Sequence, residues 1–278
     1  MSAKEKYGLV VLLDALGTST ASIHESAHYL TVVKALKARI KVSLETTLRS
    51  HQDDPKLMSA LTNLRPRFFG DSVLLTYEIT DQELFVGYLA RILFIINLLI
   101  VEAIGQRILF RGAIGIGQYV EDADVVLGPA VADVAHWYEK MDMIGVMLTP
   151  TTANIIRSRV RPVAKDKYDD ERPVADFVQW QSIPTKTGLV DGYLLDWPHF
   201  VRFSCKKDNG KALQWYYDQI SEFIVAPGTE SKYSHTDAFF RASLQRSAGK
   251  GKRRSKLPVT KALNCTGLPS VVTKRAHE

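Results

Sequence analysis

The chain has 278 residues, of which 46% are hydrophobic and 24% are charged, and its formal net charge is +6. This composition is that of an ordinary folded protein and excludes a disordered or collagen-like chain. The positive charge favours a polyanionic ligand such as a nucleotide. Much of it falls near the C-terminus, where we interpret it as a solvated tail.

The two cysteines, Cys205 and Cys265, stand far apart in the sequence, and neither has the neighbour that a zinc site or a disulfide framework requires. Residues 1–6 are charged and lack the apolar core of a secretion signal. We therefore expect a reduced, cytoplasmic protein.

The N-terminal part predicts two strands that each end close to one carboxylate. An apolar strand over residues 7–14 ends at Asp14, and a helical region follows over residues 18–49. Further on, Gly70-Asp71 separates two short apolar runs, which is typical of a tight β-hairpin. If the first strand and the hairpin are neighbours, Asp14 and Asp71 converge at one edge of a sheet.

A long apolar segment over residues 84–104 follows the hairpin. Arg91, Asn97 and Glu102 interrupt this segment. Its unbroken apolar stretches are therefore much shorter than the roughly 20 residues that a bilayer requires. We interpret the segment as a helix buried against a sheet, and we expect no membrane partner.

The remaining elements alternate between strands and helices. A glycine-rich strand over residues 108–118 suggests the close approach of another backbone or a ligand. The order of elements predicts an α+β fold in which helices cover one face of the sheet. The other expected elements are strands at 125–127, 145–149, 176–180 and 193–196, helices at 129–141, 211–223 and 235–246, a break at 51–55, and a basic, disordered tail from 249.

Two carboxylates that face one another repel unless they are protonated or bridged by cations. A pair of divalent metal ions is the natural bridge, and such pairs promote phosphoryl transfer. A helix N-cap or a strand terminus explains Asp14 alone, but it does not explain why Asp71 reaches an equivalent place. We therefore predict that Asp14 and Asp71 bind metal ions together.

Four segments, in this order, resemble motifs of the class III nucleotidyl cyclase catalytic domain. They are Asp-Ala-Leu-Gly-Thr at 14–18, Phe-Gly-Asp-Ser at 69–72, the glycine-containing strand at 111–117 and the Leu-Gly-Pro run that opens at 127. The resemblance implies an antiparallel sheet built on a ferredoxin-like βαββαβ core. The chain most resembles the pyrimidine cyclases of bacterial Pycsar antiphage systems, which share an extension similar to residues 183–198.

This resemblance implies that the chain converts UTP to 3′,5′-cyclic UMP and pyrophosphate, with CTP cyclisation or silent nucleotide binding as alternatives. It implies two Mn²⁺ or Mg²⁺ ions held by Asp14 and Asp71, with the Ala15 carbonyl as a further ligand. Backbone N–H groups after the first strand would cradle phosphates, and these belong to Leu16, Gly17 and Thr18.

The sequence departs from purine cyclases at several positions. Arg67 stands where purine cyclases have a base-reading Lys, three residues before Gly70. A guanidinium group only donates hydrogen bonds, so it suits the O2 or O4 acceptors of a pyrimidine, or a phosphate. We prefer UTP and leave CTP open. The transition-state Asn and Arg of the family fall near Ala132 or Asp133 and near His136 or Trp137, and the substitutes to consider are His136, Lys140 and Arg111.

The resemblance also implies a head-to-tail homodimer whose active sites form between the chains, and a separate effector that binds the cyclic product. We expect no nucleic-acid partner. The expected organisation is a catalytic domain over residues 1–160, a C-terminal extension over 161–248 that packs on the same domain, and a tail over 249–278.

A zinc hydrolase is the alternative from another class of enzyme. His24 and His28 stand four residues apart with Glu25 between them, which matches a zinc-protease pattern. The nearest third ligand, Glu45, lacks a surrounding motif, and the preceding turn is polar. We therefore favour a solvent-facing pair of histidines. Nucleic-acid binding by the basic tail is a weaker alternative.

Overall fold

The computed structural model describes five helical positions between residues 27 and 38, together with residues 4–16, 64–80, 85–122, 125–159, 174–221, 223, 225 and 227–249. The predicted break at 51–55, most of the helical region before it and the tail beyond residue 249 lie outside the described residues. The other predicted elements fall at least partly within them.

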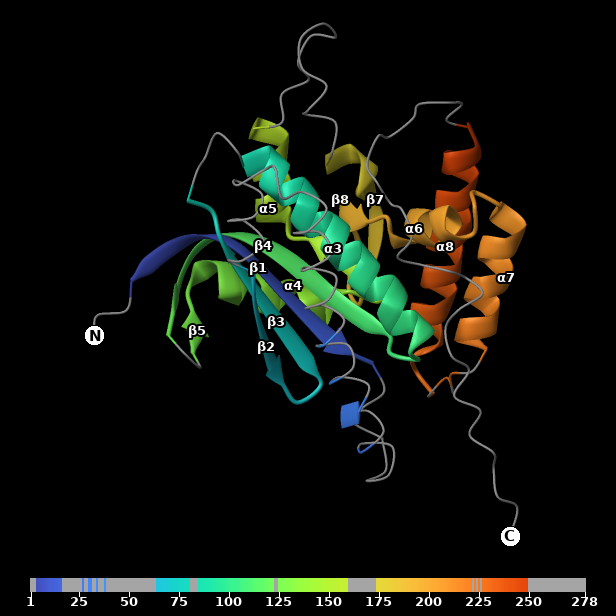
Figure 1. Cartoon of the computed structure of the whole chain (residues 1–278), viewed down its shortest axis with the longest axis horizontal. Helices are drawn as coiled ribbons and strands as arrows, with labels where there is room; N and C mark the ends of the chain where they lie inside the picture. The colour runs from blue at the N-terminus through green and yellow to red at the C-terminus, as the bar shows by residue number, and fades with distance from the viewer. Residues whose placement is uncertain are drawn as a thin grey trace, which may run out of the picture.

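The described strands form one sheet in the order β2-β3-β1-β4-β6-β8-β7, and β5 pairs with β4 beside this row (Figure 1). Every pair is antiparallel except β4 with β6. The predicted mixed α+β class is thus confirmed. The strands are β1 (Glu5–Ala15), β2 (Arg65–Phe69), β3 (Ser72–Glu78), β4 (Phe110–Glu121), β5 (Val126–Leu127), β6 (Gly145–Leu148), β7 (Val178–Thr185) and β8 (Gly188–Leu195).

Helices connect and cover these strands. The long α3 and the shorter α4 lie beside the first four strands, and three helices follow the last strand as a group. The bounds are α3 (Phe85–Gly105), α4 (Pro129–Lys140), α5 (Pro150–Arg159), η3 (Val174–Asp176), α6 (Trp197–Ser204), α7 (Asn209–Ile220) and α8 (Glu230–Gly249).

One face of the sheet is apolar and carries Leu9, Val11 and Leu13 of β1, which are at most 1% exposed. α3 lies in front of the sheet in Figure 1 and contributes buried aliphatic residues from Leu89 to Ile104. The apolar segment is therefore a helix packed in the core, as predicted. Within the described residues, no helix has the length and hydropathy needed to cross a membrane.

The other face of the sheet carries Asp14 and is covered by α4. Gly115 of β4 permits this close packing, because a Cβ there would lie 2.7 Å from Val134 Cγ1 and 3.1 Å from the Ala130 carbonyl oxygen. α3 and α4 thus lie on opposite sides of the sheet (Figure 1). This corrects the prediction that the helices cover one face, because the order of elements does not specify the side on which a helix packs.

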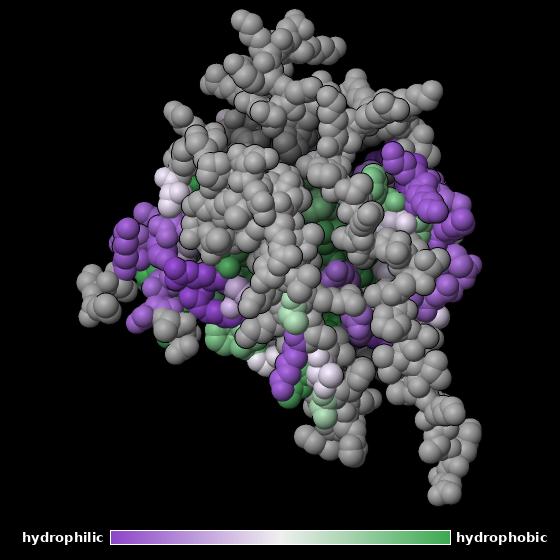
Figure 2. Space-filling model, in the orientation of Figure 1, coloured by the Kyte–Doolittle hydropathy of each residue, from purple (hydrophilic) through white to green (hydrophobic). Residues whose placement is uncertain are grey.

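Residues beyond β6 extend the same sheet and then form a helical group. β8 pairs with β6 at Leu194 and Met147, and β7 completes the row. Trp197 is fully buried between α7 and α8, and the Tyr216 and Phe240 rings stack with their centroids 4.3 Å apart. Figure 2 shows that hydrophilic residues gather over α7 and over the start of β1.

Candidate active site

Asp14 and Asp71 lie on adjoining strand ends, as predicted from the hairpin. Asp14 pairs with Ser72, the first residue of β3. Asp71 immediately precedes Ser72, and its carbonyl oxygen accepts a hydrogen bond from the Ala15 amide at 3.1 Å. The two aspartates are therefore offset by one residue across the β1–β3 ladder, at the same end of the sheet.

Arg111 of β4 holds the carboxylate of Asp14. The two residues are directly opposite in the β1–β4 register. The guanidinium donates to Asp14 Oδ2 from Nε at 3.2 Å and from Nη2 at 3.1 Å, and the Ser72 hydroxyl donates to Oδ1 at 3.2 Å. Both charged side chains are only about one-sixth exposed. Water therefore screens this ion pair less than it would screen a surface pair.

Tyr138 of α4 packs against the Arg111 side of this site. The Arg111 Cζ atom lies 5.5 Å from the centre of the Tyr138 ring, within the range of a cation–π interaction. Burial raises the pKa of the Tyr138 hydroxyl, and the negative charge of Asp14 raises it further. Tyr138 therefore remains neutral at physiological pH. Neither residue spacing nor a motif in the sequence links α4 to the end of β1, so the contact of Tyr138 with Arg111 was not predicted.

Only one of the three predicted phosphate-binding amides lies in the described residues. The Leu16 amide donates to the Leu109 carbonyl oxygen at 2.8 Å, because the β1–β4 pairing continues past the end of β1. This amide is thus already used within the sheet and does not point to a phosphate in this structure. Gly17 and Thr18 lie outside the described residues.

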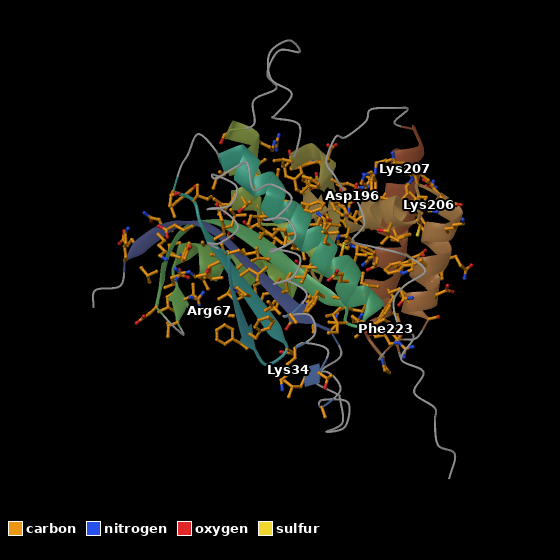
Figure 3. All side chains as sticks on the ribbon, in the orientation of Figure 1. Lys34, Arg67, Asp196, Lys206, Lys207 and Phe223 are labelled. Carbon is orange, nitrogen blue, oxygen red and sulfur yellow. The ribbon has the colours of Figure 1, made fainter. Side chains whose placement is uncertain are left out.

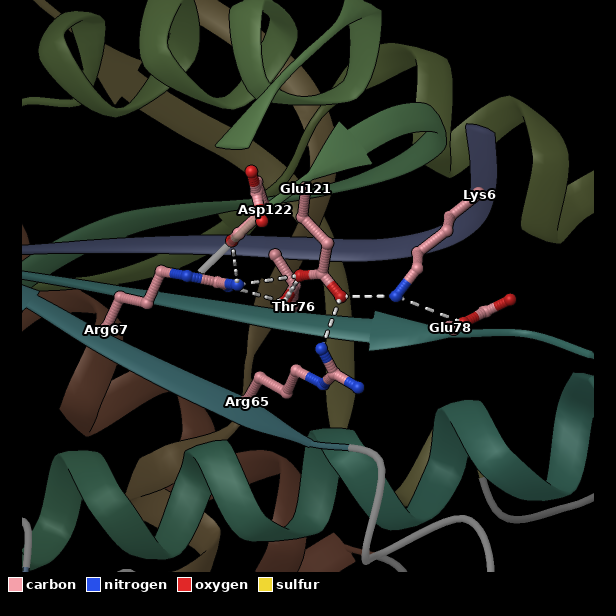
Figure 4. Close-up of polar contacts among 7 residues, drawn as sticks. All are labelled: Lys6, Arg65, Arg67, Thr76, Glu78, Glu121 and Asp122. Carbon is pink, nitrogen blue, oxygen red and sulfur yellow. Dashed lines mark hydrogen bonds and ion pairs between the residues drawn. The ribbon is translucent and has the colours of Figure 1, made fainter. Parts of the chain in front are cut away.

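Arg67 lies on the same face of the sheet as Asp14, but its guanidinium belongs to a separate ion network (Figure 4). Its Nη1 donates to the Thr76 hydroxyl at 3.1 Å, and its Nη2 donates to Glu121 Oε2 at 3.0 Å and to the Asp122 carbonyl at 3.2 Å. Figure 3 shows Arg67 on the β2 side of the sheet, well apart from the helical group near Asp196.

Glu121 is the centre of this network, and its side chain is only 3% exposed. It also accepts from Lys6 Nζ at 2.5 Å and from the Thr76 hydroxyl at 2.9 Å, and it forms an ion pair with Arg65 Nη1 at 3.2 Å. Burial alone would raise the pKa of Glu121, but the hydrogen bonds from Lys6 and Thr76 and the Lys6 charge outweigh burial and lower it. Lys6 precedes Asp14 by eight residues of β1, roughly 26 Å. Arg67 itself is nearer, because it pairs with Leu74 and Leu74 pairs with Leu12, two residues before Asp14. Its guanidinium contacts Thr76 and Glu121, on the side away from Asp14.

The oxygen donors at the aspartate pair are chemically suited to hard divalent cations. Asp14 and Asp71 supply carboxylates, and Mg²⁺ is commonly bound by one or two carboxylates together with substrate phosphates. Among the described residues, no group of three or more His, Cys, Asp or Glu side chains could hold a metal by itself. The zinc pattern at residues 24–28 and Glu45 lie outside the described residues.

The positions of the expected transition-state residues lie on α4. His136 is exposed and makes an edge contact with Trp137, and the Lys140 ammonium group lies 5.1 Å from the centre of the Trp137 ring. Of the three substitute candidates, Arg111 is the one that contacts Asp14.

No family model and no curated protein matches this chain. Solved structures include similar folds at low identity. One is the catalytic core of a rhodopsin-guanylyl cyclase with converted specificity, in complex with ATPαS (13% identity, TM-score 0.41). Another is an adenylate/guanylate cyclase/hydrolase from Silicibacter pomeroyi (14%, TM-score 0.36). Each match covers 70% of this chain and 98% of the other.

Proposed function

We propose that the chain is a nucleotidyl cyclase that converts UTP to 3′,5′-cyclic UMP and pyrophosphate. The observation that carries the proposal is the adjoining placement of Asp14 and Asp71 at one end of the sheet. The sequence motifs that resemble those of class III cyclases also support the proposal, because they contain these same two residues. Cyclisation of CTP to cyclic CMP is the closest alternative.

In this proposal, Asp14, Asp71 and the Ala15 carbonyl would hold two Mn²⁺ or Mg²⁺ ions. Such ions promote ionisation of the substrate 3′-hydroxyl and neutralise the charge of the leaving pyrophosphate. The 3′-oxygen forms a bond to the α-phosphorus while the bond between the α-phosphorus and the bridging oxygen breaks. The hydroxyl proton passes to solvent, and no protein nucleophile is needed.

Arg111 is placed to assist this chemistry. Its guanidinium is fixed beside Asp14 by two hydrogen bonds and by the Tyr138 ring. A fixed cation at the metal-binding carboxylate can also stabilise negative charge that develops on the phosphates. This placement makes Arg111 our preferred replacement for the transition-state residues that α4 lacks.

We assign base recognition to Arg67, as a donor to pyrimidine carbonyl oxygens. Glu121 supports this role by fixing the guanidinium plane from its Nη2 side. The Arg67 guanidinium is directed away from Asp14 of its own chain, to Thr76 and Glu121, an orientation that agrees with an active site assembled from two chains. We therefore propose a head-to-tail homodimer in which one chain supplies the aspartates and the other supplies Arg67.

The resemblance to Pycsar cyclases supports a role in antiphage defence, with a separate effector that binds the cyclic product. We also retain the expected organisation into a catalytic part (1–160), an extension (161–248) and a tail (249–278). The extension continues the sheet of the catalytic part through β8, which favours a single folded unit over two separate ones.

The direct test incubates the purified full chain with each of the four nucleoside triphosphates and Mn²⁺, followed by mass identification of the products. We expect cyclic UMP and pyrophosphate in equal amounts, and loss of both in Asp14→Asn. The matched control is Asp218→Asn, because Asp218 is an exposed carboxylate on α7. Failure to form a cyclic product from any triphosphate would reject the proposal.

A catalytically silent nucleotide-binding protein is the second candidate. It is favoured by the absence of Asn and Arg at residues 132–133 and 136–137. In that case UTP with Mn²⁺ raises the thermal unfolding midpoint of the chain, and no product accumulates. Turnover by the wild-type chain excludes this candidate.

A further inference from the structure

We propose that Lys232 of α8 forms a polyphosphate subsite beside Asp14, so that the C-terminal helical group takes part in binding the triphosphate of the substrate. This inference rests on the proposed function for its substrate, but the subsite itself is argued from the packing of α8 against the active-site end of the sheet.

The first turns of α8 are fixed next to β6 by two contacts. The Ile144 amide donates to the buried Thr236 hydroxyl at 2.9 Å. His235 Nδ1 lies 2.9 Å from the Asp142 carbonyl oxygen and 3.4 Å from its carboxylate. These contacts place the beginning of α8 against the segment that leads into β6.

That segment ends at the same end of the sheet as the aspartates. Gly145, the first residue of β6, is paired with Arg111, and Arg111 is paired with Asp14. Lys232 lies one helical turn before Thr236, and its carbonyl oxygen accepts the Thr236 hydroxyl. The β7–β8 turn lies against the end of α4, because the Lys186 amide donates to the Lys140 carbonyl oxygen at 2.8 Å.

Charged groups from four segments act electrostatically on the Lys232 ammonium group. They are Arg111 of β4, Asp142 after α4, Lys186 of the β7–β8 turn and Asp14 of β1. Burial lowers the pKa of the Lys232 ammonium group, and the Arg111 and Lys186 charges lower it further, against the opposing effect of the two aspartates. The protein therefore holds this ammonium group where its charge is disfavoured.

A bound polyanion would instead favour the charged form of the Lys232 ammonium group. A triphosphate that approaches Asp14 through metal ions would bring several negative oxygens to Arg111, Lys186 and Lys232, and hydrogen bonds between charged partners are the strong ones. The interaction would be made with the ligand and not within the free protein. Lys232 is thus suited to substrate binding.

The test measures binding of inorganic tripolyphosphate with Mg²⁺ to the full chain by calorimetry, which needs no turnover. We expect Lys232→Met to weaken this binding about tenfold or more, and Lys232→Arg to retain most of it. The matched control is Lys211→Met on α7, since Lys211 is 73% exposed and pairs with Asp208. Lys232→Gln serves as a second neutral variant if Lys232→Met unfolds, and circular dichroism establishes which variants are folded.

Each outcome separates the subsite from the cyclase proposal. If the wild type cyclises UTP and Lys232→Met has an unchanged KM and tripolyphosphate affinity, the subsite is rejected and the cyclase stands. If the wild type makes no cyclic product but binds tripolyphosphate through Lys232, the subsite stands and the cyclase fails. A wild-type chain that does not bind tripolyphosphate overturns the subsite.

Discussion

Asp14 of β1 and Arg111 of β4 stand directly opposite one another, and two N–H groups of the guanidinium donate to the same carboxylate oxygen. Ser72 donates to the other oxygen from β3. Three neighbouring strands therefore position a single carboxylate. This arrangement fixes the orientation of Asp14 before any cation or substrate binds.

Replacing Arg111 with Ala leaves the Asp14 carboxylate largely buried and without its cation. We expect a loss of about 1–3 kcal/mol in the free energy of unfolding. This lies between the contribution of an exposed ion pair and the cost of breaking a buried one. Urea denaturation measures it. We also expect kcat/KM for UTP to fall at least about tenfold.

The variant Arg111→Lys is the matched control, because it keeps the charge but cannot reproduce the two parallel hydrogen bonds. Arg111→Lys should recover part of the unfolding free energy that Arg111→Ala loses, and a smaller part of the lost kcat/KM. Unfolding free energies of the wild type and Arg111→Ala that agree within experimental error would show that the pair does not position Asp14.

Glu121 makes the stability of the fold depend on pH. The pKa of Glu121 is lowered in the folded state. Its contribution to the free energy of unfolding is therefore complete above the pKa of the unfolded chain, near 4.5, and is lost as the pH falls through the lower pKa of the folded state. Glu121→Gln leaves Lys6 and Arg67 without their buried partner. We expect it to lower the unfolding free energy by about 2–4 kcal/mol at pH 7.

This deficit should shrink as the pH falls below 4.5, because the wild type then loses the same interaction. Asp218→Asn, on the exposed side of α7, should show neither effect. A deficit for Glu121→Gln that stays constant from pH 7 to pH 3 would contradict the role assigned to this carboxylate.

Gly115 allows α4 to bring Tyr138 to the site. Gly115→Ala would place a methyl group 2.7 Å from Val134 Cγ1 and 3.1 Å from a backbone oxygen of α4. We expect a loss of about 1–3 kcal/mol in unfolding free energy. Activity should also fall at temperatures where the variant is fully folded, since α4 must shift.

Gly87→Ala in α3 is the control substitution, since a Cβ there meets no atom within 4 Å. It should raise the unfolding free energy by about 0.5–1 kcal/mol, because Ala favours the helix over Gly. Equal effects of the two substitutions on stability would mean that the Gly115 contact does not limit the position of α4.

The sequence predicted the part of the site that depends on local patterns. The apolar run before Asp14 and the Gly70-Asp71 turn specify a strand end and a hairpin, and both are found in the structure. Asp14 and Arg111 are 97 residues apart in the chain, so their contact follows only from the register of β1 with β4. No local pattern contains that register.

The C-terminal part was the least predictable. The helices α5 and α6 were missed, and α8 begins five residues before the predicted start at residue 235. Pro150 and Pro198 stand in the first turns of α5 and α6, where a proline is compatible with a helix, although the same residue also indicates a turn. The position of Lys232 depends on how α8 packs, which periodicity alone does not specify.

The central claim is that Asp14 and Asp71 hold the same cations. The most direct test measures Mn²⁺ binding to the full chain by electron paramagnetic resonance, in the presence of a UTP analogue that cannot be cyclised. We predict two bound Mn²⁺ ions per site in the wild type and loss of binding in both Asp14→Asn and Asp71→Asn. Wild-type Mn²⁺ binding in either single variant would contradict a shared metal site.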